Sequence, residues 1–599
     1  MIKLSDYVID FLVEKNIKNV FLVAGGGIMH LIDSVGKNKN INYIANHHEQ
    51  ASATAAESYS RLTNDIGVCL VTTGPGGTNA ITGVAGAWVD SIPMIVISGQ
   101  VKRELIANYE KVRQIGPQEI NIVGMVKGIT KYAKTIMEPD TIKYELEKAY
   151  FEAKNGRPGP VWLDIPLDVQ AAMVDEKKMI GFSVPKIQKN EKELDKKINK
   201  VIDLLKKSKR PVIIAGNGIR LSHGNEMFKT LVNKLKVPVL TTVNGLDLIE
   251  EKNKYFFGRF GPMGQRRANF VLQNADLVLS VGASLNVSTT GFDFDNFARG
   301  AKKISINIDE SELTTRKVKI DLSICVDARF FLEKLLKGID KFNFEWDKRW
   351  LKVCHFWKNK YPTVLNQFLS DKNHINSYVF FKELSDSLNS MDVLTTGVGL
   401  DVVSFIQSFE VKRNQRAFVN KNFGQMGWDL PAVIGTCVAN KFKRVVSVCG
   451  DGSFQMNIQE LGTISFYKMP IKIFVFNNGG YKTIRDTQNN LFEGRFVGAD
   501  KKSGVSNPDF RKIADAYKMN YFLLKNHTCL SENIKKVLKQ KGPVLCEVNI
   551  DFDQQRIPKV STIKLENGNL VSKPLEDMFP FLSEAEIYAN MHMFDEKEI

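Results

Sequence analysis

Two polar residues, Asp451 and Asn478, stand at a spacing that suits metal chemistry. Each follows an apolar run that predicts a buried strand, residues 444–449 and 471–476, and a helical pattern at 457–467 lies between the runs. The separation of 27 residues (478 − 451) fits one strand–helix–strand crossover. Because such strands are parallel neighbours, we expect both residues beyond the carboxyl ends of the strands, where open α/β sheets bind ligands.

The two residues offer carboxylate and amide oxygens, which are the hard ligands that Mg²⁺ prefers. Gly450 and Gly452 let the main chain approach phosphate oxygens, and the helix that follows points its first amide groups toward the same place. The pattern therefore predicts a site for a metal ion and a diphosphate. A lone Gly-Asp-Gly is more often a tight turn after a strand, so the pairing with Asn-Asn at this distance carries the prediction.

Gly-Asp-Gly at 450–452 followed by Asn-Asn at 477–478 resembles the signature of thiamine diphosphate enzymes, in the branch of acetolactate synthase, pyruvate decarboxylase and pyruvate oxidase. The resemblance implies an Mg²⁺ ion held by Asp451, Asn478 and the main-chain carbonyl of Gly480. It also implies cofactor contacts from Gly450, Asp451, Gly452, Ser453, Asn478, Gly480 and Tyr481.

Thiamine chemistry needs a carboxyl group against the pyrimidine ring of the cofactor. Residues 46–50, Asn-His-His-Glu-Gln, follow a predicted strand and resemble the Arg-His-Glu-Gln segment of acetolactate synthases. The match implies that Glu49 is the activating acid and contacts the cofactor. Alone, Glu49 would merely favour a helix start, an effect worth less than about 1 kcal/mol. His47 and His48 match no catalytic histidine pair of the family, and we expect His48 to pack or hydrogen-bond near the acid.

Three further segments resemble the cofactor site of that family. Residues 72–79 form a glycine-rich strand-to-helix loop that fails the dinucleotide spacing and resembles the loop lying against the pyrimidine. Residues 424–427, Gly-Gln-Met-Gly, match the turn whose methionine wedges under the cofactor, although a methionine is usually core filler. Residues 398–399 match a strand end at the diphosphate. The contacts so implied come from Thr73, Pro75, Asn79, Val398, Gly399, Gly424 and Met426.

The substrate end of the site matches the family less well. Gly26 lies in a Gly-Gly-Gly loop whose amides could steady a developing oxyanion, or the loop is a plain helix-entry turn. Gln118 matches a glutamine near the reaction intermediate, although Pro117 replaces a phenylalanine. Gly26 and Gln118 join the acid as predicted catalytic residues. Ser288 replaces the arginine expected to hold the carboxylate of a second keto acid, and Thr487 replaces an acceptor-selecting tryptophan.

The resemblance also implies FAD in the middle of the chain. There Ser284, Asn286 and Val287 replace an arginine and two aspartates of the family's flavin segment, whereas Gly216 and Gly218 remain. The sequence alone leaves FAD binding open.

The composition is that of a soluble globular protein, with 43% hydrophobic and 25% charged residues among 599. The net charge of +16 comes from lysines spread along the chain, so we expect attraction of anionic substrates rather than nucleic-acid binding. No secretory pattern or membrane-length apolar run is present, which predicts a cytoplasmic protein without membrane contact. Seven cysteines without a Cys-x-x-Cys predict buried thiols.

The order of apolar runs and helical patterns predicts an α/β protein with three doubly wound parallel-sheet domains. Charged stretches at 175–200 and 340–361 predict linkers between them. The expected domains are a pyrimidine-binding domain at 1–175, a central domain at 190–340, a diphosphate- and Mg²⁺-binding domain at 360–555 and a C-terminal tail at 556–599. Strands are expected at 20–24, 41–45, 67–72, 94–98, 161–165, 211–215, 237–241, 277–281, 303–308, 393–396, 445–449, 471–476 and 544–550.

Together these features favour an enzyme similar to acetolactate synthase that decarboxylates a 2-keto acid, with pyruvate as the first candidate. Such an enzyme transfers the acyl carbanion to an acceptor. The sequence does not identify this acceptor. In that family the cofactor lies between the Glu49 domain of one subunit and the Asp451 domain of the next, which implies a homodimer or homotetramer. The alternatives are a simple decarboxylase or C–C hydrolase or lyase with the same cofactor, an inactive regulatory paralogue, and a nucleotide-binding module. The presence of Glu49 argues against the paralogue, and the missing dinucleotide pattern argues against the module.

Overall fold

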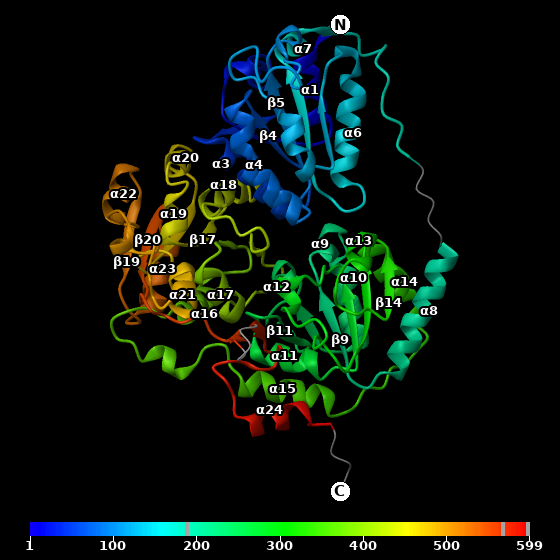
Figure 1. Cartoon of the computed structure of the whole chain (residues 1–599), viewed down its shortest axis with the longest axis vertical. Helices are drawn as coiled ribbons and strands as arrows, with labels where there is room; N and C mark the ends of the chain where they lie inside the picture. Colours follow the sequence, from blue (N-terminus) through cyan, green and yellow to red (C-terminus); the bar gives the residue numbers. More distant parts are fainter. Residues whose placement is uncertain (186–190, 565–569, 595–599) are drawn as a thin grey trace.

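The computed structural model describes residues 1–185, 191–564 and 570–594, and three six-stranded sheets organise it (Figure 1). All neighbouring strands within these three sheets run parallel, and helices flank them. The first unit lies at the top of the view, the central unit at the right and the third unit at the left. This architecture confirms the predicted fold class, whereas the exact domain limits stay predictions.

The sheet of the first unit has the order β3-β2-β4-β5-β7-β6. Strands β4, β5 and β7 are buried on both faces, as their nearly continuous apolar sequences require. The strands are β2 (Asn19–Leu22), β3 (Asn42–Ala45), β4 (Gly67–Val71), β5 (Met94–Gln100), β6 (Tyr132–Thr135) and β7 (Pro160–Pro166), and the main helices are α1 (Leu4–Glu14), α2 (Met29–Lys37), α3 (Glu49–Thr63), α4 (Pro75–Val89) and α6 (Ile142–Lys154).

The central sheet has the order β11-β10-β9-β12-β13-β14. Its strands are β9 (Pro211–Ala215), β10 (Val239–Thr241), β11 (Phe256–Arg259), β12 (Leu277–Val281), β13 (Lys302–Asn307) and β14 (Leu322–Cys325). The helices around it include α8 (Glu191–Lys207), α9 (Gly218–Leu221), α10 (Asn225–Leu235), α11 (Arg266–Gln273), α12 (Val287–Thr290), α13 (Glu310–Thr314), α14 (Ala328–Ile339) and α15 (Trp350–Lys360).

The sheet of the third unit has the order β16-β15-β17-β18-β20-β19, which repeats the strand order of the first unit. Its strands are β15 (Val393–Thr396), β16 (Ala417–Val419), β17 (Val445–Gly450), β18 (Ile471–Asn477), β19 (Asn520–Leu524) and β20 (Val544–Asn549). Its helices are α16 (Ser377–Ser387), α17 (Leu400–Ser408), α18 (Asp429–Ala439), α19 (Asp451–Gln455), α20 (Glu460–Phe466), α21 (Lys482–Leu491), α22 (Phe510–Ala516) and α23 (Leu530–Lys539).

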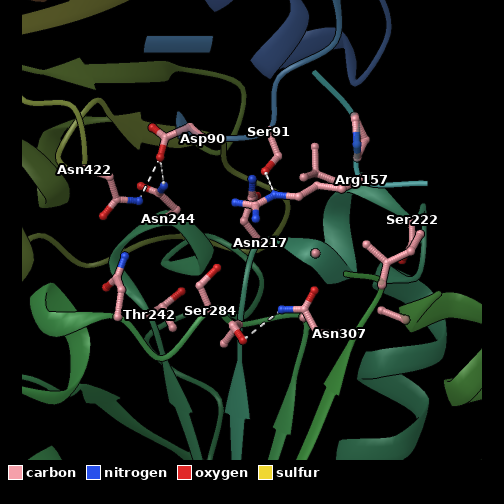
Figure 2. A pocket seen from close by; sticks show the side chains of 18 of the residues that line it. Asp90, Ser91, Arg157, Asn217, Ser222, Thr242, Asn244, Ser284, Asn307 and Asn422 are labelled. Carbon is pink, nitrogen blue, oxygen red and sulfur yellow. Dashed lines mark hydrogen bonds between the residues drawn. The ribbon is translucent and has the colours of Figure 1, made fainter. Parts of the chain in front are cut away.

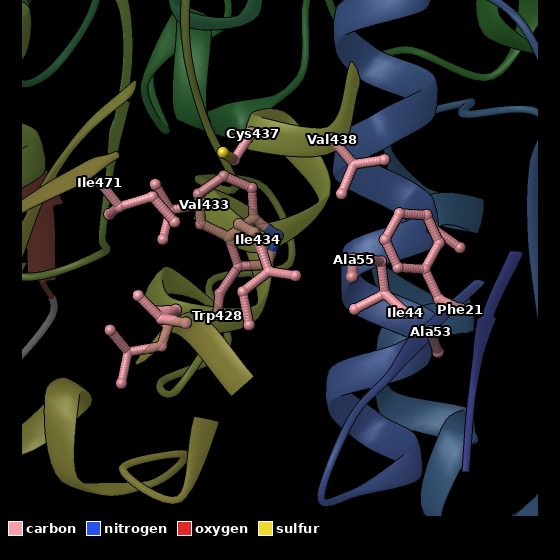
Figure 3. Close-up of a cluster of buried hydrophobic side chains, with 14 of the residues drawn as sticks. Phe21, Ile44, Ala53, Ala55, Trp428, Val433, Ile434, Cys437, Val438 and Ile471 are labelled. Carbon is pink, nitrogen blue, oxygen red and sulfur yellow. The ribbon is translucent and has the colours of Figure 1, made fainter. Parts of the chain in front are cut away.

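The first and third units share one hydrophobic core, in which α3 packs against α18 (Figure 3). Helix α3 presents small side chains, Ala53 and Ala55, so that the backbone of α18 approaches closely. At Gly435 of α18 an added Cβ would lie 1.9 Å from the carbonyl oxygen of Ala55, so only glycine fits there. Trp428 at the start of α18 completes the contact, with its indole Nε1 donating to Glu57.

Both predicted linkers contain helices, which corrects the interpretation of those stretches. Helix α8 begins at Glu191 and buries Leu194 and Ile198. Charged residues between these two positions mask the apolar periodicity of the helix in the sequence. Residues 186–190 lie outside the described residues. Helix α15 buries Trp350 and Trp357 against the central unit. The helical pattern predicted at 457–467 corresponds to α20, and the shorter helix α19 precedes it directly after β17.

The described part of the tail returns to the central unit. The amide of Val560 donates to the carbonyl of Pro262, and the guanidinium of Arg266 donates to the carbonyl of Met578. Helix α24 (Glu584–Met591) lies under α15, where Asn590 accepts a hydrogen bond from the indole of Trp357 (Figure 1). Residues 565–569 and 595–599 of the predicted tail lie outside the described residues.

Two composition-based predictions can be compared with the structure. Five cysteines are buried, but Cys325 and Cys529 are exposed, so the prediction of buried thiols is wrong for these two. None of the helices in the described part of the chain has the length and apolar character that a bilayer crossing would require.

Candidate active site

The predicted acid Glu49 is the first residue of α3. The ring Nδ1 of His48 accepts a hydrogen bond from the amide of Gln50 and so caps the helix, which places the carboxyl of Glu49 at its amino end. Glu49 Oε2 accepts a hydrogen bond of 2.9 Å from the side-chain amide of Asn79. Two predicted cofactor residues are therefore in contact, one from α3 and one from α4.

The other predicted residues of the first unit gather around the same edge of the sheet. The amide of Gly27, next to Gly26, donates to the hydroxyl of Thr72 at 3.0 Å. Gly74 has a φ of +66° and lies against Gln118, whose carbonyl oxygen would be 2.1 Å from an added Cβ. Thr73 is buried, and its hydroxyl has no hydrogen-bond partner within the described residues. The structure thus brings Gly26, Glu49, Thr73, Pro75, Asn79 and Gln118 into one group.

Asp451 lies at the junction of β17 and α19 with 1% of its surface exposed. Its Oδ2 accepts hydrogen bonds from the amide of Gly480 at 2.9 Å, the amide of Asn478 at 3.2 Å and the side chain of Asn507 at 2.6 Å. Burial raises the pKa of Asp451, and these hydrogen bonds oppose that rise. The crossover predicted from the spacing of 27 residues therefore brings Asp451 and Asn478 together, as expected.

The residues around Asp451 fit a divalent cation. The Oδ1 atom of Asn478 is buried without a hydrogen-bond partner in the described part of the chain, so it offers a free ligand oxygen. A cation there would also favour the charged form of the carboxyl group. Within the described ranges no three His, Cys, Asp or Glu side chains form a metal site, so such an ion would depend on amide and carbonyl oxygens beside Asp451.

The remaining predicted residues of the third unit border the same loop. The ring of Tyr481 packs on Gly452, where an added Cβ would lie 2.1 Å from the ring. The hydroxyl of Ser453 accepts a hydrogen bond of 2.9 Å from the amide of Gly427, next to Met426, and so connects two of the predicted segments. The amide of Gly399, next to Val398, donates to Asp401 at 2.8 Å. Gly424 has a φ of +69°, which favours glycine at that turn.

Two buried carboxyl groups, Asp401 and Asp429, lie beneath these residues and were missed by the sequence reasoning. Each has an oxygen within 2.5 Å of the point that a Cβ of Gly397 would occupy, so the two groups face each other. Burial and the charge of Asp401 raise the pKa of Asp429 to about 7, and burial raises the pKa of Asp401 to about 6. The hydroxyl of Ser453 donates to Asp429, which connects the pair to the predicted cofactor site.

Glu460, the first residue of α20, was also missed. It is fully buried and accepts hydrogen bonds from the side chain of Asn46 at 3.0 Å, the amide of His47 at 2.9 Å and the hydroxyl of Thr463 at 2.8 Å. Glu460 therefore connects the crossover that carries Asp451 to the loop that carries Glu49. No local pattern marks this role, because Asn46 and His47 lie more than 400 residues from Glu460 in the sequence.

A cavity opens where the strands of the central sheet end, between the three units (Figure 2). The volume of the cavity, including its opening to solvent, is about 1070 Å³. Arg157 reaches over it, held by Ser91 and by Asp309, and Ser284, Asn307 and Asn217 line its floor. The cavity coincides with the segment in which the resemblance places FAD, and most of its lining is uncharged.

Comparisons with known proteins agree along nearly the whole chain. Sequence profiles of the thiamine pyrophosphate enzymes match residues 2–125 (N-terminal TPP binding domain), 198–335 (central domain) and 397–548 (C-terminal TPP binding domain). The acetolactate synthase large subunit of Cyanidium caldarium is 30% identical over 92% of this chain and 94% of its own length. That of Lactococcus lactis is 31% identical over 93% and 94%, and the probable large subunit of Methanocaldococcus jannaschii is 32% identical over 91% and 92%.

Proposed function

We propose that this chain, which belongs to the family of thiamine pyrophosphate enzymes similar to acetolactate synthase large subunits, is a Mg²⁺-dependent carboligase. It decarboxylates a 2-keto acid, with pyruvate as the first candidate, and transfers the acyl carbanion to an acceptor. The observation that carries the proposal is the placement of the Asp451 carboxylate beside Asn478, whose buried side-chain oxygen has no hydrogen-bond partner among the described residues.

The residues of the chain have distinct tasks in this reaction. When bound, the cofactor supplies a carbanion at its thiazolium carbon. Asp451, Asn478 and the carbonyl of Gly480 would hold the ion that anchors the diphosphate, and Met426 would contact the cofactor. Glu49 would exchange a proton with the pyrimidine ring, and Asn79 fixes the orientation of its carboxyl group. Amides near Gly26 and the side chain of Gln118 would face the reacting carbonyl.

We further propose a homodimer or homotetramer with active sites between subunits. In one chain Glu49 contacts Asn79 of its own unit, and Asp451 is enclosed by residues of the third unit. The link between the two units passes through Glu460. A second chain would then bring its own acid to the Asp451 site. We expect the enzyme in the cytoplasm.

The acceptor is the least constrained part of the proposal. Ser288 and Thr487 lack the charge and the ring that the resemblance expects at those positions. Their loss favours, as the second candidate, a decarboxylase or C–C hydrolase in which a proton or water replaces the acceptor. Product analysis by NMR after incubation with pyruvate separates the two, since acetaldehyde without a ligation product indicates the decarboxylase.

Absorbance of the purified protein in the flavin bands decides whether the central cavity holds FAD.

Replacing Glu49 with Gln tests the assignment of the acid. The amide keeps the size of the side chain but cannot exchange the proton, so carbon dioxide release should fall at least about 100-fold. Thermal unfolding and the uptake of thiamine diphosphate with Mg²⁺, measured by calorimetry, should stay close to those of the wild type. Undiminished turnover in E49Q would refute the role of Glu49, and an absence of cofactor uptake by the wild type would refute the function.

A further inference from the structure

The side chain of Asn507 touches the carboxylate of Asp451. Asn507 lies in the loop before α22, outside every segment that the sequence singles out for the cofactor. Its Nδ2 atom donates hydrogen bonds to Asp451 Oδ2 at 2.6 Å and to Asn477 Oδ1 at 3.2 Å. Its Oδ1 atom accepts a hydrogen bond of 3.0 Å from the side chain of Gln455, the last residue of α19. Both ends of this amide are therefore in use beside the predicted metal ligand.

The hydrogen bonds to Asp451 are unevenly divided between its two carboxylate oxygens. Oδ2 accepts three, from the side chain of Asn507 and from the amides of Asn478 and Gly480. Oδ1 accepts one within the described part of the chain, from the amide of Gly452 at 2.7 Å. A carboxylate offers about four lone-pair sites, two on each oxygen. Oδ2 is therefore saturated, whereas Oδ1 keeps a site for a cation.

The orientation of the Asn507 amide follows from its neighbours. The carboxylate of Glu547 accepts a hydrogen bond of 2.7 Å from Asn477 Nδ2 and one of 2.6 Å from the hydroxyl of Tyr521. Because Asn477 turns its NH₂ group to this carboxylate, its oxygen faces Asn507. Asn507 must then present its own NH₂ group to two oxygens, that of Asn477 and that of Asp451. The network thus fixes Asn507 as a donor to the carboxylate.

The segment that carries Asn507 is fastened to the turn around Gly480, whose carbonyl is a predicted metal ligand. The amide of Tyr481 donates to the carbonyl of Ala499 at 2.8 Å, and Gly480 forms an antiparallel bridge with Asp500. Gly480 has a φ of +124°, and an added Cβ would lie 2.5 Å from the carbonyl oxygen of Ala499, so only glycine fits there. The position of Asn507 is therefore tied to that of this turn.

The saturation of Oδ2 decides how Asp451 can bind a cation. Mg²⁺ requires a nearly regular octahedron of oxygens at about 2.0–2.1 Å, which a carboxylate joins best through one oxygen. Ca²⁺ is larger, takes about six to eight oxygens and often binds both oxygens of one carboxylate. A carboxylate whose second oxygen is held by three donors suits the first mode and opposes the second.

We propose that Asn507 is a positioning residue that reserves Oδ1 of Asp451 for the metal ion and so makes the site selective for Mg²⁺ over Ca²⁺. The inference rests on the proposed function and deepens it, because Asn507 acts on the ion through Asp451 without binding it. Among the three donors to Oδ2, Asn507 alone uses its side chain. A substitution can therefore remove its hydrogen bond and leave the two main-chain amides in place.

The test measures ion uptake by the cofactor-stripped, full-length chain in the presence of thiamine diphosphate. Calorimetric titrations use Mg²⁺ or Ca²⁺, each with a blank titration into the cofactor alone. Asn507→Ala should bind Mg²⁺ at least about tenfold more weakly, as is typical when a metal ligand loses an outer contact. Ca²⁺ can use the released oxygen, so its affinity should fall less than about threefold. Asn507→Leu keeps a branched side chain without the donor and should give the same change in the ratio of the two affinities.

The matched control is Asn520→Ala, which removes an exposed asparagine at the start of β19 in the same unit. It should leave both affinities unchanged. Gln455→Ala removes the contact behind Asn507 and should shift the ratio in the same direction by a smaller factor. Thermal unfolding of each variant without metal checks that the chain is folded.

Equal losses of both affinities in Asn507→Ala and Asn507→Leu would overturn the inference, because they would indicate a general loosening of the site. Unchanged affinities in both variants, or a wild type that binds the two ions equally well, would overturn it as well. Failure of the proposed function has a different signature, since the wild type would then take up no thiamine diphosphate with either ion.

Discussion

At the scale of single residues, the candidate site combines residues that a sequence can reveal with residues that it hides. Asp451 and Asn478 were predicted because a fixed spacing and two apolar runs place them at one edge of a sheet. Asp401 and Asp429 gave no signal, since an isolated aspartate in a sequence is expected on the surface. Their burial depends on the glycine at position 397, where any side chain would collide with both carboxyl groups.

The facing carboxyl groups Asp401 and Asp429 should make stability depend on pH. Their pKa values in the folded chain, about 6 and about 7, lie above those of exposed aspartates, so the folded state binds extra protons between roughly pH 4 and 7. The free energy of unfolding therefore falls as pH rises through this window. Asp429→Asn should reduce that fall by a few kcal/mol.

Urea denaturation of the metal-free protein at pH 5 and pH 7.5 measures this difference. The variant should gain stability over the wild type at the higher pH, where the wild-type pair would otherwise hold two charges. Parallel pH profiles for the two proteins would show that Asp429 already carries its charge at pH 5.

At the scale of elements, all the central strands of the three sheets were predicted, but of the six edge strands only β3, expected at 41–45, was predicted. Strand β12 matches its predicted range of 277–281, because both its faces are buried and its residues are uniformly apolar. Strands β6, β11, β14, β16 and β19 were not predicted, and each lies at an edge of its sheet. One face of an edge strand is often exposed, so its sequence is short or mixes apolar with polar residues. The sequence of β6, Tyr-Ala-Lys-Thr, is an example, and it shows no apolar pattern.

The link between α20 and the Glu49 loop gives a prediction at this scale. Glu460→Gln replaces two acceptor oxygens by one oxygen and an amide, so the hydrogen bonds to Asn46 and His47 cannot both be kept. Because a small displacement of a reacting group is costly, kcat should fall about 10- to 100-fold while KM for the donor changes little. Hydrogen exchange at residues 45–50, followed by mass spectrometry, should become faster.

The matched control for this prediction is Glu532→Gln, an exposed glutamate at the start of α23 in the same unit. It should leave both kcat and the exchange rates unchanged. Wild-type kcat and exchange in Glu460→Gln would mean that the loop holds its position without this contact.

At the scale of the whole molecule, the placement of the two halves of the site leads to a complementation test. A hybrid dimer of one Glu49→Gln chain and one Asp451→Ala chain contains one intact site if sites form between subunits. Hybrids purified through two different affinity tags should recover about half of wild-type activity, whereas each variant alone should be inactive. An inactive hybrid would place a complete site within each chain.

The contact of α3 with α18 also has a consequence for how the chain is made. Helix α3, with its face of small residues, ends at Thr63, and α18, which packs on that face, begins at Asp429, 366 residues later (429 − 63). At 5 to 20 residues per second, a ribosome needs roughly 20 to 70 s to supply the covering helix. During that time the nascent first unit exposes an apolar, close-packing surface, which makes it a natural client for a chaperone that acts during translation.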